Sequence, residues 1–369
     1  MKILILANFG MGLYNFRKEL LEELISQNHE VYTSFPRDEY SIKLEEIGCK
    51  FIDTPISRRG TNPIKDFKLF MDYKKIIRNI QPDVVLTYTI KPNIYGGIAC
   101  RLENVPYIAN ITGLGTAVEN GGILRKITLF LYKISLNKAD CVFFQNEENK
   151  NFLTKRNIIK GNHKVIPGSG VNLNHYTTLS YPKDTTVNFL YISRVMKEKG
   201  IDQFLDAATY IKEKYPNTKF HIVGFCENGY EDKLKAMQER GVVEFHGKQK
   251  DVRKFHKMSH CTIHPTYYPE GMSNVLLESA ACGRPIITTD RSGCREVVDD
   301  GKNGFLIKQK NSEDLIKKIE EFLKLEYETK KLLGLNGRVK IEREFDRGII
   351  IGEYLDVLSG VEKRNKDGL

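Results

Sequence analysis

The residues best suited to chemistry are two cations that directly follow one apolar run in the second half of the chain. Arg194 and Lys199 come after the run at 189–192 and before a helical pattern at 201–214. Arginine offers a planar fork that matches phosphate oxygens, and lysine adds a compact point charge. The pair could therefore neutralise a diphosphate as it leaves a reacting carbon; a solvated basic loop is the alternative interpretation.

Two carboxylates, eight residues apart, follow a second predicted strand, at 261–264. Glu270 lies in a turn before Gly271, and Glu278 lies inside a helix that should begin near Ser273 or Asn274. The free N–H groups at the start of such a helix suit a pyrophosphate. Glu278 could accept hydrogen bonds from ribose hydroxyls, and Glu270 could reach a sugar ring. The same pattern is also compatible with a capped helix carrying two solvated carboxylates.

A glycine-containing segment follows the first apolar run, at 2–7. Gly10 and Gly12 would let the backbone approach a ligand, and the helix predicted at 15–27 would offer its N-terminus. The G-x-G-x-x-G pattern is incomplete because position 15 is Asn15, and no acidic residue ends the next strand. These departures argue against a nicotinamide dinucleotide site.

Strand and helix patterns alternate along the whole chain, which predicts parallel sheets with helices on both faces. Other first-half strands are predicted at 30–34, 50–53, 84–87, 107–111, 141–145 and 164–166. Helices are predicted between them at 41–47, 63–80, 93–102 and 124–137. Second-half strands are predicted at 189–192, 219–223, 243–245, 261–264 and 285–288. Their helices are predicted at 201–214, 230–240, 252–257, 274–282, 313–323, 326–343 and 348–358.

A chain of 369 residues predicts two domains of ordinary size with a cleft between them. The segment 167–183, rich in Gly, Ser, Thr, Asn and Pro, marks the boundary. In doubly wound sheets ligands bind beyond the carboxyl ends of the strands, where both the cation pair and the carboxylate pair are predicted to lie.

Composition narrows the class of protein and its surroundings. The seven cysteines are scattered without a C-x-x-C pair, which predicts buried thiols in a reducing compartment. The first residues lack the long apolar region of a signal peptide, and no run approaches a membrane span. The net charge is +10 and the first half is the more basic, which favours a membrane, a phosphate-bearing substrate or a nucleic acid as partner, or simply a lysine-rich surface.

Taken in order, these motifs resemble the retaining glycosyltransferases of the GT-B fold, glycosyltransferase family 4, over nearly the whole chain. The most specific segments are SRVMKEKG (193–200), EGMSNVLLESAACGRPII (270–287) and DDGKNGFLI (299–307). The resemblance implies two Rossmann-like doubly wound domains facing across a cleft. It implies an acceptor domain at 1–170, a nucleotide-sugar domain at 171–345, and a final helix at 346–369 that crosses back to the first domain.

The resemblance also implies roles for particular residues. Arg194 and Lys199 would hold the diphosphate and Glu278 the ribose, while Glu270 would contact the transferred sugar and support an oxocarbenium-like transition state. Donor-side positions include backbone segments around the phosphates, the sugar and the base, and glycines that would close over the donor from the first domain: Gly10, Gly12, Gly247, Gly271, Met272, Ser273 and Asn274.

One departure concerns the acceptor side. Many family members carry a histidine after the strand corresponding to 107–111, whereas this chain reads NITGLG at 110–115. Thr112 or a backbone N–H would substitute, and Asn15 is a second acceptor-side candidate. The segments at 12–20, 87–97 and 110–117 look like those of bacterial enzymes that extend polyprenyl-diphosphate-linked sugars for surface polysaccharides or protein glycans. Such enzymes often use UDP-N-acetylgalactosamine, UDP-galactose or UDP-N-acetylglucosamine.

We expect no metal or other cofactor in this reaction, because no D-x-D motif occurs. His256, His260 and His264 have a spacing of four, but the last lies at a strand end, so packing is the expected role. Two basic amphipathic segments, 63–80 and 122–138, predict a peripheral protein on the cytoplasmic face of the membrane, although helices packed on a sheet would look similar. The rival functions are a UDP-sugar epimerase on the same fold and, more remotely, a non-catalytic nucleic-acid or membrane binder. We expect no nucleic-acid partner, because the cations are dispersed.

Overall fold

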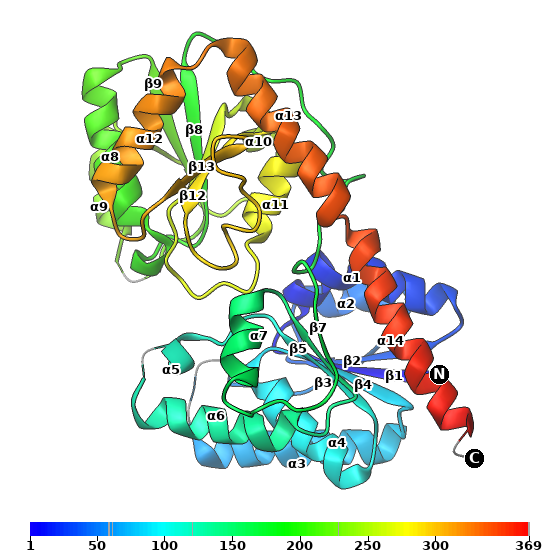
Figure 1. Ribbon diagram of the computed structural model, residues 1–369. Helices are drawn as coiled ribbons and strands as arrows, with labels where there is room; N and C mark the ends of the chain where they lie inside the picture. The colour runs from blue at the N-terminus through cyan, green and yellow to red at the C-terminus, as the bar shows by residue number, and fades with distance from the viewer. Residues whose placement is uncertain (58–59, 61, 120, 228, 368–369) are drawn as a thin grey trace. The chain divides into compact units, whose positions relative to one another are not determined.

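The computed structural model describes residues 1–57, 60, 62–119, 121–227 and 229–367. It consists of two α/β units, drawn in Figure 1. The first unit comprises Met1–Gly170 together with Arg347–Leu369, and the second comprises Val171–Asp346. Each unit is built on a parallel sheet, as the alternation of strand and helix predicts.

The first unit's described residues form a seven-stranded parallel sheet in the order β3-β2-β1-β4-β5-β6-β7. Its strands are β1 (Lys2–Leu6), β2 (Glu30–Phe35), β3 (Lys50–Asp53), β4 (Val84–Tyr88), β5 (Tyr107–Ile111), β6 (Cys141–Phe144) and β7 (His163–Val165). Strands β4, β5 and β6 are buried along their whole length, which explains why their sequences are mostly apolar.

Alternating side chains of β1 enter two separate cores, one on each face of this sheet. Ile3 and Ile5 join one core and Leu4 and Leu6 the other. The first core is covered by α1 (Gly10–Ser26), α2 (Glu39–Glu46) and α14 (Arg347–Asp367). The second is covered by α3 (Pro63–Ile80), the π-helical turn η1 (Pro92–Gly96), α4 (Gly97–Glu103), α5 (Thr116–Glu119), α6 (Gly122–Leu136) and α7 (Glu147–Thr154).

The second unit's described residues form a six-stranded parallel sheet in the order β10-β9-β8-β11-β12-β13. Its strands are β8 (Val187–Ile192), β9 (Thr218–Val223), β10 (Glu244–Phe245), β11 (Cys261–His264), β12 (Ile286–Thr289) and β13 (Gly304–Ile307). One face packs against α8 (Ile201–Lys214), α9 (Glu231–Glu239) and α12 (Ser312–Lys324). The other packs against α10 (Arg253–Met258), α11 (Asn274–Ala281) and α13 (Tyr327–Glu344).

The strand order reverses once in each sheet, and this position determines where a ligand would bind. The reversal lies between β1 and β4 in the first unit and between β8 and β11 in the second. Loops that follow the two central strands diverge to opposite faces and leave a crevice at the carboxyl edge. The loops after β8 and β11 carry Arg194, Lys199 and Glu270.

Several predicted elements need correction. The first helix begins at Gly10 rather than at residue 15, so Gly10 and Gly12 lie in its first turn and not in a loop. The helix predicted at 93–102 starts as a π-helical turn at Pro92, and the last helix runs to Asp367 rather than to 358. Helix α7 and strand β13 were not predicted, because each is short and shows little periodicity. All seven cysteines are free, and all except Cys226 are buried, as expected.

Candidate functional site

The loops after β8 and β11 are joined by backbone contacts that need a glycine. Gly200, between the short 3-10 turn η2 (Lys197–Lys199) and α8, has φ +75°, and a Cβ there would lie 2.1 Å from the Pro265 carbonyl oxygen. The Tyr267 N–H also donates to the Glu198 carbonyl oxygen at 2.9 Å. Because the loops are fixed to each other, the side chains they carry have a defined relative position.

Lys199 and Glu270, predicted separately from the sequence, form an ion pair across these loops. The Lys199 ammonium donates to Glu270 Oε1, and the two side chains are only 10% and 15% exposed. The ammonium also lies 4.8 Å from the centroid of the Tyr268 ring. A strongly shielded cation and anion therefore lie together at the switch point of the second sheet.

Arg194 forms a second ion pair on the same side of the sheet. Its Nη1 lies 3.2 and 3.3 Å from the two carboxylate oxygens of Glu227, and its guanidinium lies 5.3 Å from the Tyr268 ring centroid. Tyr268 is thus shared by Arg194 and Lys199. Sequence reasoning missed both Glu227 and Tyr268. Glu227 could have been identified because it lies four residues beyond the end of β9. Tyr268 could have been identified because it lies in the same loop as Glu270.

The segment that leads into α11 is fixed by its backbone. The Ser273 N–H donates to the Gly293 carbonyl oxygen at 2.8 Å, and its hydroxyl lies 3.2 Å from His264 Nε2. Met272 is buried in the apolar core beside α11, so its backbone rather than its side chain is available to a ligand. The helix begins at Asn274, as predicted.

Glu278 lies one turn inside α11 and is half-buried. Burial and the nearby Glu278 carboxylate, which accepts a hydrogen bond from the Tyr176 hydroxyl, raise the pKa of Tyr176 well above its ordinary value. Tyr176 therefore keeps its proton at neutral pH and can continue to donate this hydrogen bond to Glu278. No local sequence pattern indicated that Tyr176 would be the partner of Glu278.

Gly247 and Gly224 form the turn beyond β9 and β10. Gly247 has φ +63°, and its carbonyl oxygen accepts a hydrogen bond from the Gly224 N–H at 2.9 Å. A Cβ on Gly224, at φ +151°, would lie 1.7 Å from the Ser193 carbonyl oxygen, whereas Gly247 faces open space. Gly224 is a further position that the sequence reasoning missed; its glycine allows the Arg194 loop to approach β9.

The remaining candidates belong to the first unit. Gly10 lacks a side chain for a packing reason, because a Cβ there would lie 2.5 Å from Asp38 Oδ1; its N–H donates to Asp38 Oδ2 at 2.8 Å. Gly12 lies two residues after Gly10 on α1, and a Cβ there would lie 3.0 Å from the Phe9 ring. Asn15 is exposed on the same helix. Thr112 directly follows β5 and is half-buried.

Thr89 is a first-unit residue that the sequence reasoning missed. It follows β4, at the switch point of this sheet, and has φ +73°, a conformation that β-branched residues strongly disfavour. Its hydroxyl oxygen is buried and makes no hydrogen bond with any residue that the structure describes. Strain and an unsatisfied polar atom at a sheet's carboxyl edge are features of functional sites.

The three histidines with a spacing of four do not form one cluster. His256 lies on α10, His264 ends β11, and His260 accepts a hydrogen bond from the Asn188 N–H. Burial lowers the pKa of each of the three rings, to about 3 for His256 and His264 and about 4 for His260. They are neutral core residues at physiological pH.

Two family models match the chain and together span most of it. Residues 180–340 match the model described as glycosyl transferases group 1, and residues 2–146 match the one described as glycosyl transferase 4-like. The border between the two matches agrees with the border between the two structural units.

Relatives and solved structures extend over the same length. The chain is 28% identical to the N,N'-diacetylbacillosaminyl-diphospho-undecaprenol α-1,3-N-acetylgalactosaminyltransferase of Campylobacter jejuni, covering 98% of this chain and 100% of the relative. It is 26% identical to the UDP-Gal:α-D-GlcNAc-diphosphoundecaprenol α-1,3-galactosyltransferase of Escherichia coli. That match covers 71% of this chain and 72% of the relative. HepE of Anabaena, solved with UDP and glucose, superposes with a TM-score of 0.78 at 19% identity, covering 98% and 100%.

Proposed function

Because the chain belongs to the group 1 glycosyltransferases, we propose that it transfers a hexose or an N-acetylhexosamine from a UDP-sugar to a polyprenyl-diphosphate-linked saccharide. N-acetylgalactosamine, galactose and N-acetylglucosamine are the favoured sugars, and the product serves surface polysaccharide or glycoprotein glycan assembly. The relatives named above act on diphospho-undecaprenol-linked sugars and form α linkages, which supports this acceptor class and retention of configuration.

One observation carries the donor assignment: Lys199 and Arg194 lie around one tyrosine ring at the switch point of the second sheet, each held by a carboxylate. Each cation therefore has its charge balanced by one carboxylate, Glu227 for Arg194 and Glu270 for Lys199. A sugar diphosphate arriving at this edge brings phosphate oxygens that replace the carboxylates as partners of the two cations. The donor would then be held by Arg194 and Lys199, and Glu270 would be released beside it.

The chemistry follows from these positions. Lys199 and Arg194 would stabilise the negative charge that develops on UDP as the glycosidic bond breaks, and the acceptor oxygen would attack from the leaving-group face. Glu270 would stabilise the oxocarbenium-like sugar by its charge and would position it. It would not act as one of the two acid/base carboxylates of a glycosidase. The ribose would be bound by Glu278, the base would be flanked by Gly247, and the transfer would require no metal.

The acceptor would be bound by the first unit, at the carboxyl edge of its sheet. Thr89 supports this, because its strained backbone and buried unsatisfied hydroxyl lie at the switch point of that sheet. Thr112 ends the neighbouring strand β5 and remains the candidate for the position where other family members carry a histidine. Gly10, Gly12 and Asn15 remain predictions for the same unit.

A lipid-linked acceptor needs a protein surface that meets the bilayer, and helices α3 and α6 supply one. None of the described helices is long and apolar enough to cross a membrane. Both α3 and α6 pack on the same core of the first unit, so they cover one face of its sheet. Their outward positions carry exposed large apolar side chains: Ile64, Phe67, Met71, Ile123, Leu124, Ile127 and Phe130. Exposed lysines lie among them: Lys65, Lys68, Lys75, Lys126 and Lys133.

This combination favours insertion of the apolar side chains into the headgroup layer of an anionic membrane, where each nearby lysine contributes about 1 kcal/mol. We therefore place the protein peripherally, on the cytoplasmic face of the membrane. Flotation with phosphatidylglycerol vesicles tests this surface. Replacing Phe67 and Phe130 by serine should abolish flotation, whereas the control Leu332→Ser, an exposed leucine on α13 of the second unit, should leave it unchanged. Equal flotation of all three proteins would contradict the assignment.

The function itself is tested with a panel of UDP-sugars and short polyprenyl-diphosphate saccharides, followed by NMR of the product anomer. We expect transfer from one of the three favoured sugars with an α linkage. Incubation with the UDP-sugar alone should return it unchanged, whereas an epimerase would convert it. A β-linked product or an epimerised nucleotide sugar would overturn the proposal.

A further inference from the structure

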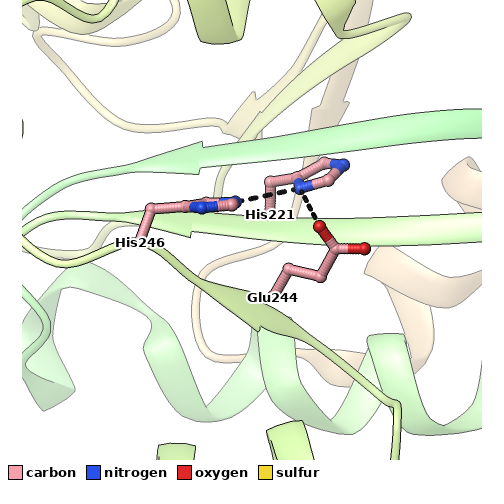
Figure 2. A group of neighbouring side chains, drawn as sticks. All are labelled: His221, Glu244 and His246. Atoms are coloured by element: carbon pink, nitrogen blue, oxygen red, sulfur yellow. Dashed lines mark hydrogen bonds and ion pairs between the residues drawn. The ribbon is translucent and has the colours of Figure 1, made fainter.

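Three potential metal ligands converge at the edge of the second sheet (Figure 2). None of them belongs to the two ion pairs described above. They are His221 on β9, Glu244 on β10 and His246 directly after β10. His221 pairs in register with Glu244 in the parallel ladder, so their side chains project from the same face. His246, two residues after Glu244, projects from that face as well. The backbone register alone therefore brings the three side chains together.

Hydrogen bonds determine which atom of His221 faces this cluster. The Asn188 amide donates its Nδ2 hydrogen to the Thr186 carbonyl oxygen, so its Oδ1 faces His221 Nε2, at 3.1 Å. Nε2 therefore carries the ring proton, and the lone pair is on Nδ1. Nδ1 lies 3.1 Å from His246 Nε2 and 3.3 Å from Glu244 Oε2, as the dashed lines of Figure 2 mark.

This arrangement brings a neutral imidazole lone pair, a second imidazole nitrogen and a carboxylate oxygen to one point. If His246 Nε2 carries a proton, it can donate a hydrogen bond to the lone pair on His221 Nδ1. The Glu244 carboxylate then still faces that lone pair without a proton between them. A metal ion would satisfy all three donors at once.

We propose that His221, Glu244 and His246 bind a divalent transition metal of the zinc class, with water completing the coordination. Two histidines and one carboxylate are a recognised zinc donor set, with zinc–ligand distances of about 2.0–2.2 Å. A tetrahedron of that size has edges of about 3.3 Å, close to the two separations measured here. Asn188 acts as the outer hydrogen-bond partner that orients a metal-binding histidine.

One side of the site is buried and the other is open to solvent, so water could complete the coordination of a bound ion from the open side. The His221 ring is 3% exposed, whereas the Glu244 side chain is 44% exposed. Lys219 competes for the carboxylate, since its ammonium lies 3.0 Å from Glu244 Oε1. That lysine is itself half in solvent, so it can swing away when a divalent ion enters.

The metal would have a structural effect. Strand β10 has two residues and forms the edge of the sheet. A metal shared by β9 and the residues of β10 would fix this edge and the His246–Gly247 turn. The inference rests on these side chains and does not depend on the proposed transfer reaction.

Metal titration of the full chain, with any affinity tag removed and after treatment with a chelator, tests the site. We expect one zinc ion per chain by calorimetry and, with Co²⁺ as probe, the visible absorption of a tetrahedral site. Glu244→Gln and His246→Asn should each weaken binding at least about tenfold, and Asn188→Ala by about 10–100-fold. The control His163→Asn changes an exposed histidine of the first unit and should have no effect.

A second readout is independent of the spectra. Zinc at 100 times the wild-type Kd should raise the free energy of unfolding of the wild-type chain by about 2.7 kcal/mol, a hundredfold shift of the equilibrium. At the same zinc concentration a variant that binds tenfold more weakly should gain only about 1.4 kcal/mol, and the Glu244→Gln and His246→Asn variants should gain that or less. Because these positions are partly exposed, both variants should fold, which circular dichroism checks. Absence of saturable binding at one ion per chain, or equal binding by the wild type and both variants, would overturn the proposal.

Discussion

Replacing Glu270 by glutamine separates its charge from its shape. Glutamine has nearly the same size, and its carbonyl oxygen can still accept a hydrogen bond from the Lys199 ammonium, so the loop after β11 should keep its conformation. Only the negative charge disappears. If Glu270 stabilises positive charge on the transferred sugar, turnover should fall although the donor still binds.

The expected size of the effect follows from preorganised electrostatics. Removing one group that faces developing charge costs about 10²–10³ in kcat, or about 2.7–4 kcal/mol. The UDP affinity should remain close to that of the wild type, because both cations assigned to the diphosphate are intact. Glu270→Ala should abolish transfer as well, and it should also destabilise the second unit. Removing one partner of a buried pair costs about 3–5 kcal/mol, and the 10% and 15% exposure of this pair places the cost at the lower end.

The assay is single-turnover transfer with enzyme in excess over a labelled lipid-linked acceptor, since this isolates chemistry from product release. UDP binding is measured by calorimetry on the same preparations, and circular dichroism verifies the fold. Near-normal single-turnover rates for Glu270→Gln or Glu270→Ala would refute the assignment of Glu270. A parallel loss of UDP affinity and turnover would make it a binding residue instead.

Three further predictions concern the second unit. Lys199→Ala should weaken UDP binding and turnover together, each by about tenfold or more, because a charge-assisted hydrogen bond contributes about 1.5–3 kcal/mol; unchanged affinity in calorimetry would contradict this. Gly224→Ala should lower the urea midpoint by more than Gly247→Ala, since only the former places a Cβ on the Ser193 carbonyl; equal shifts would contradict the packing. Stability should fall as the pH drops from about 6.5 toward 4, because buried His256 has a folded pKa of about 3, below its unfolded value, and unfolding then takes up a proton. His256→Phe should reduce that slope by up to about 1.4 kcal/mol per pH unit, measured by urea unfolding at several pH values.

Much of the fold was predictable because the strands are buried on both faces. Segments such as β1 and β8 are largely apolar runs followed by turn residues, and their alternation with helices permits few arrangements. Strand ends were predictable for the same reason, so the sequence placed Arg194, Lys199 and Glu270 at the carboxyl edge. What it could not provide was the pairing, because Lys199 and Glu270 are 71 residues apart.

The roles of the glycines, unlike the positions of the strands, could not be predicted from the sequence. Gly10 looked like part of a ligand-binding loop, but its lack of a side chain is required by packing against Asp38 and by the start of α1. The sequence could not distinguish a glycine required by a ligand from one required by a neighbouring side chain. Gly224 and the strained Thr89 were missed for a related reason, since their constraints arise from chain segments that the local pattern does not contain.

If the donor diphosphate binds where we propose, the two ion pairs keep both of its cations partnered before the donor arrives. A cation as shielded as Lys199 would cost several kcal/mol if it had no partner. Glu270 removes that cost for Lys199, and Glu227 is the partner of Arg194. The two carboxylates come from different loops, after β11 and after β9. The same carboxylates would also limit which ligands bind, because a ligand must interact with Arg194 and Lys199 more strongly than Glu227 and Glu270 do. A single phosphate or a carboxylate would only exchange one partner for another, whereas a diphosphate can engage both cations at once. Selectivity for a nucleoside diphosphate over a monophosphate would then arise from the pairs themselves, before any contact with base or sugar is made.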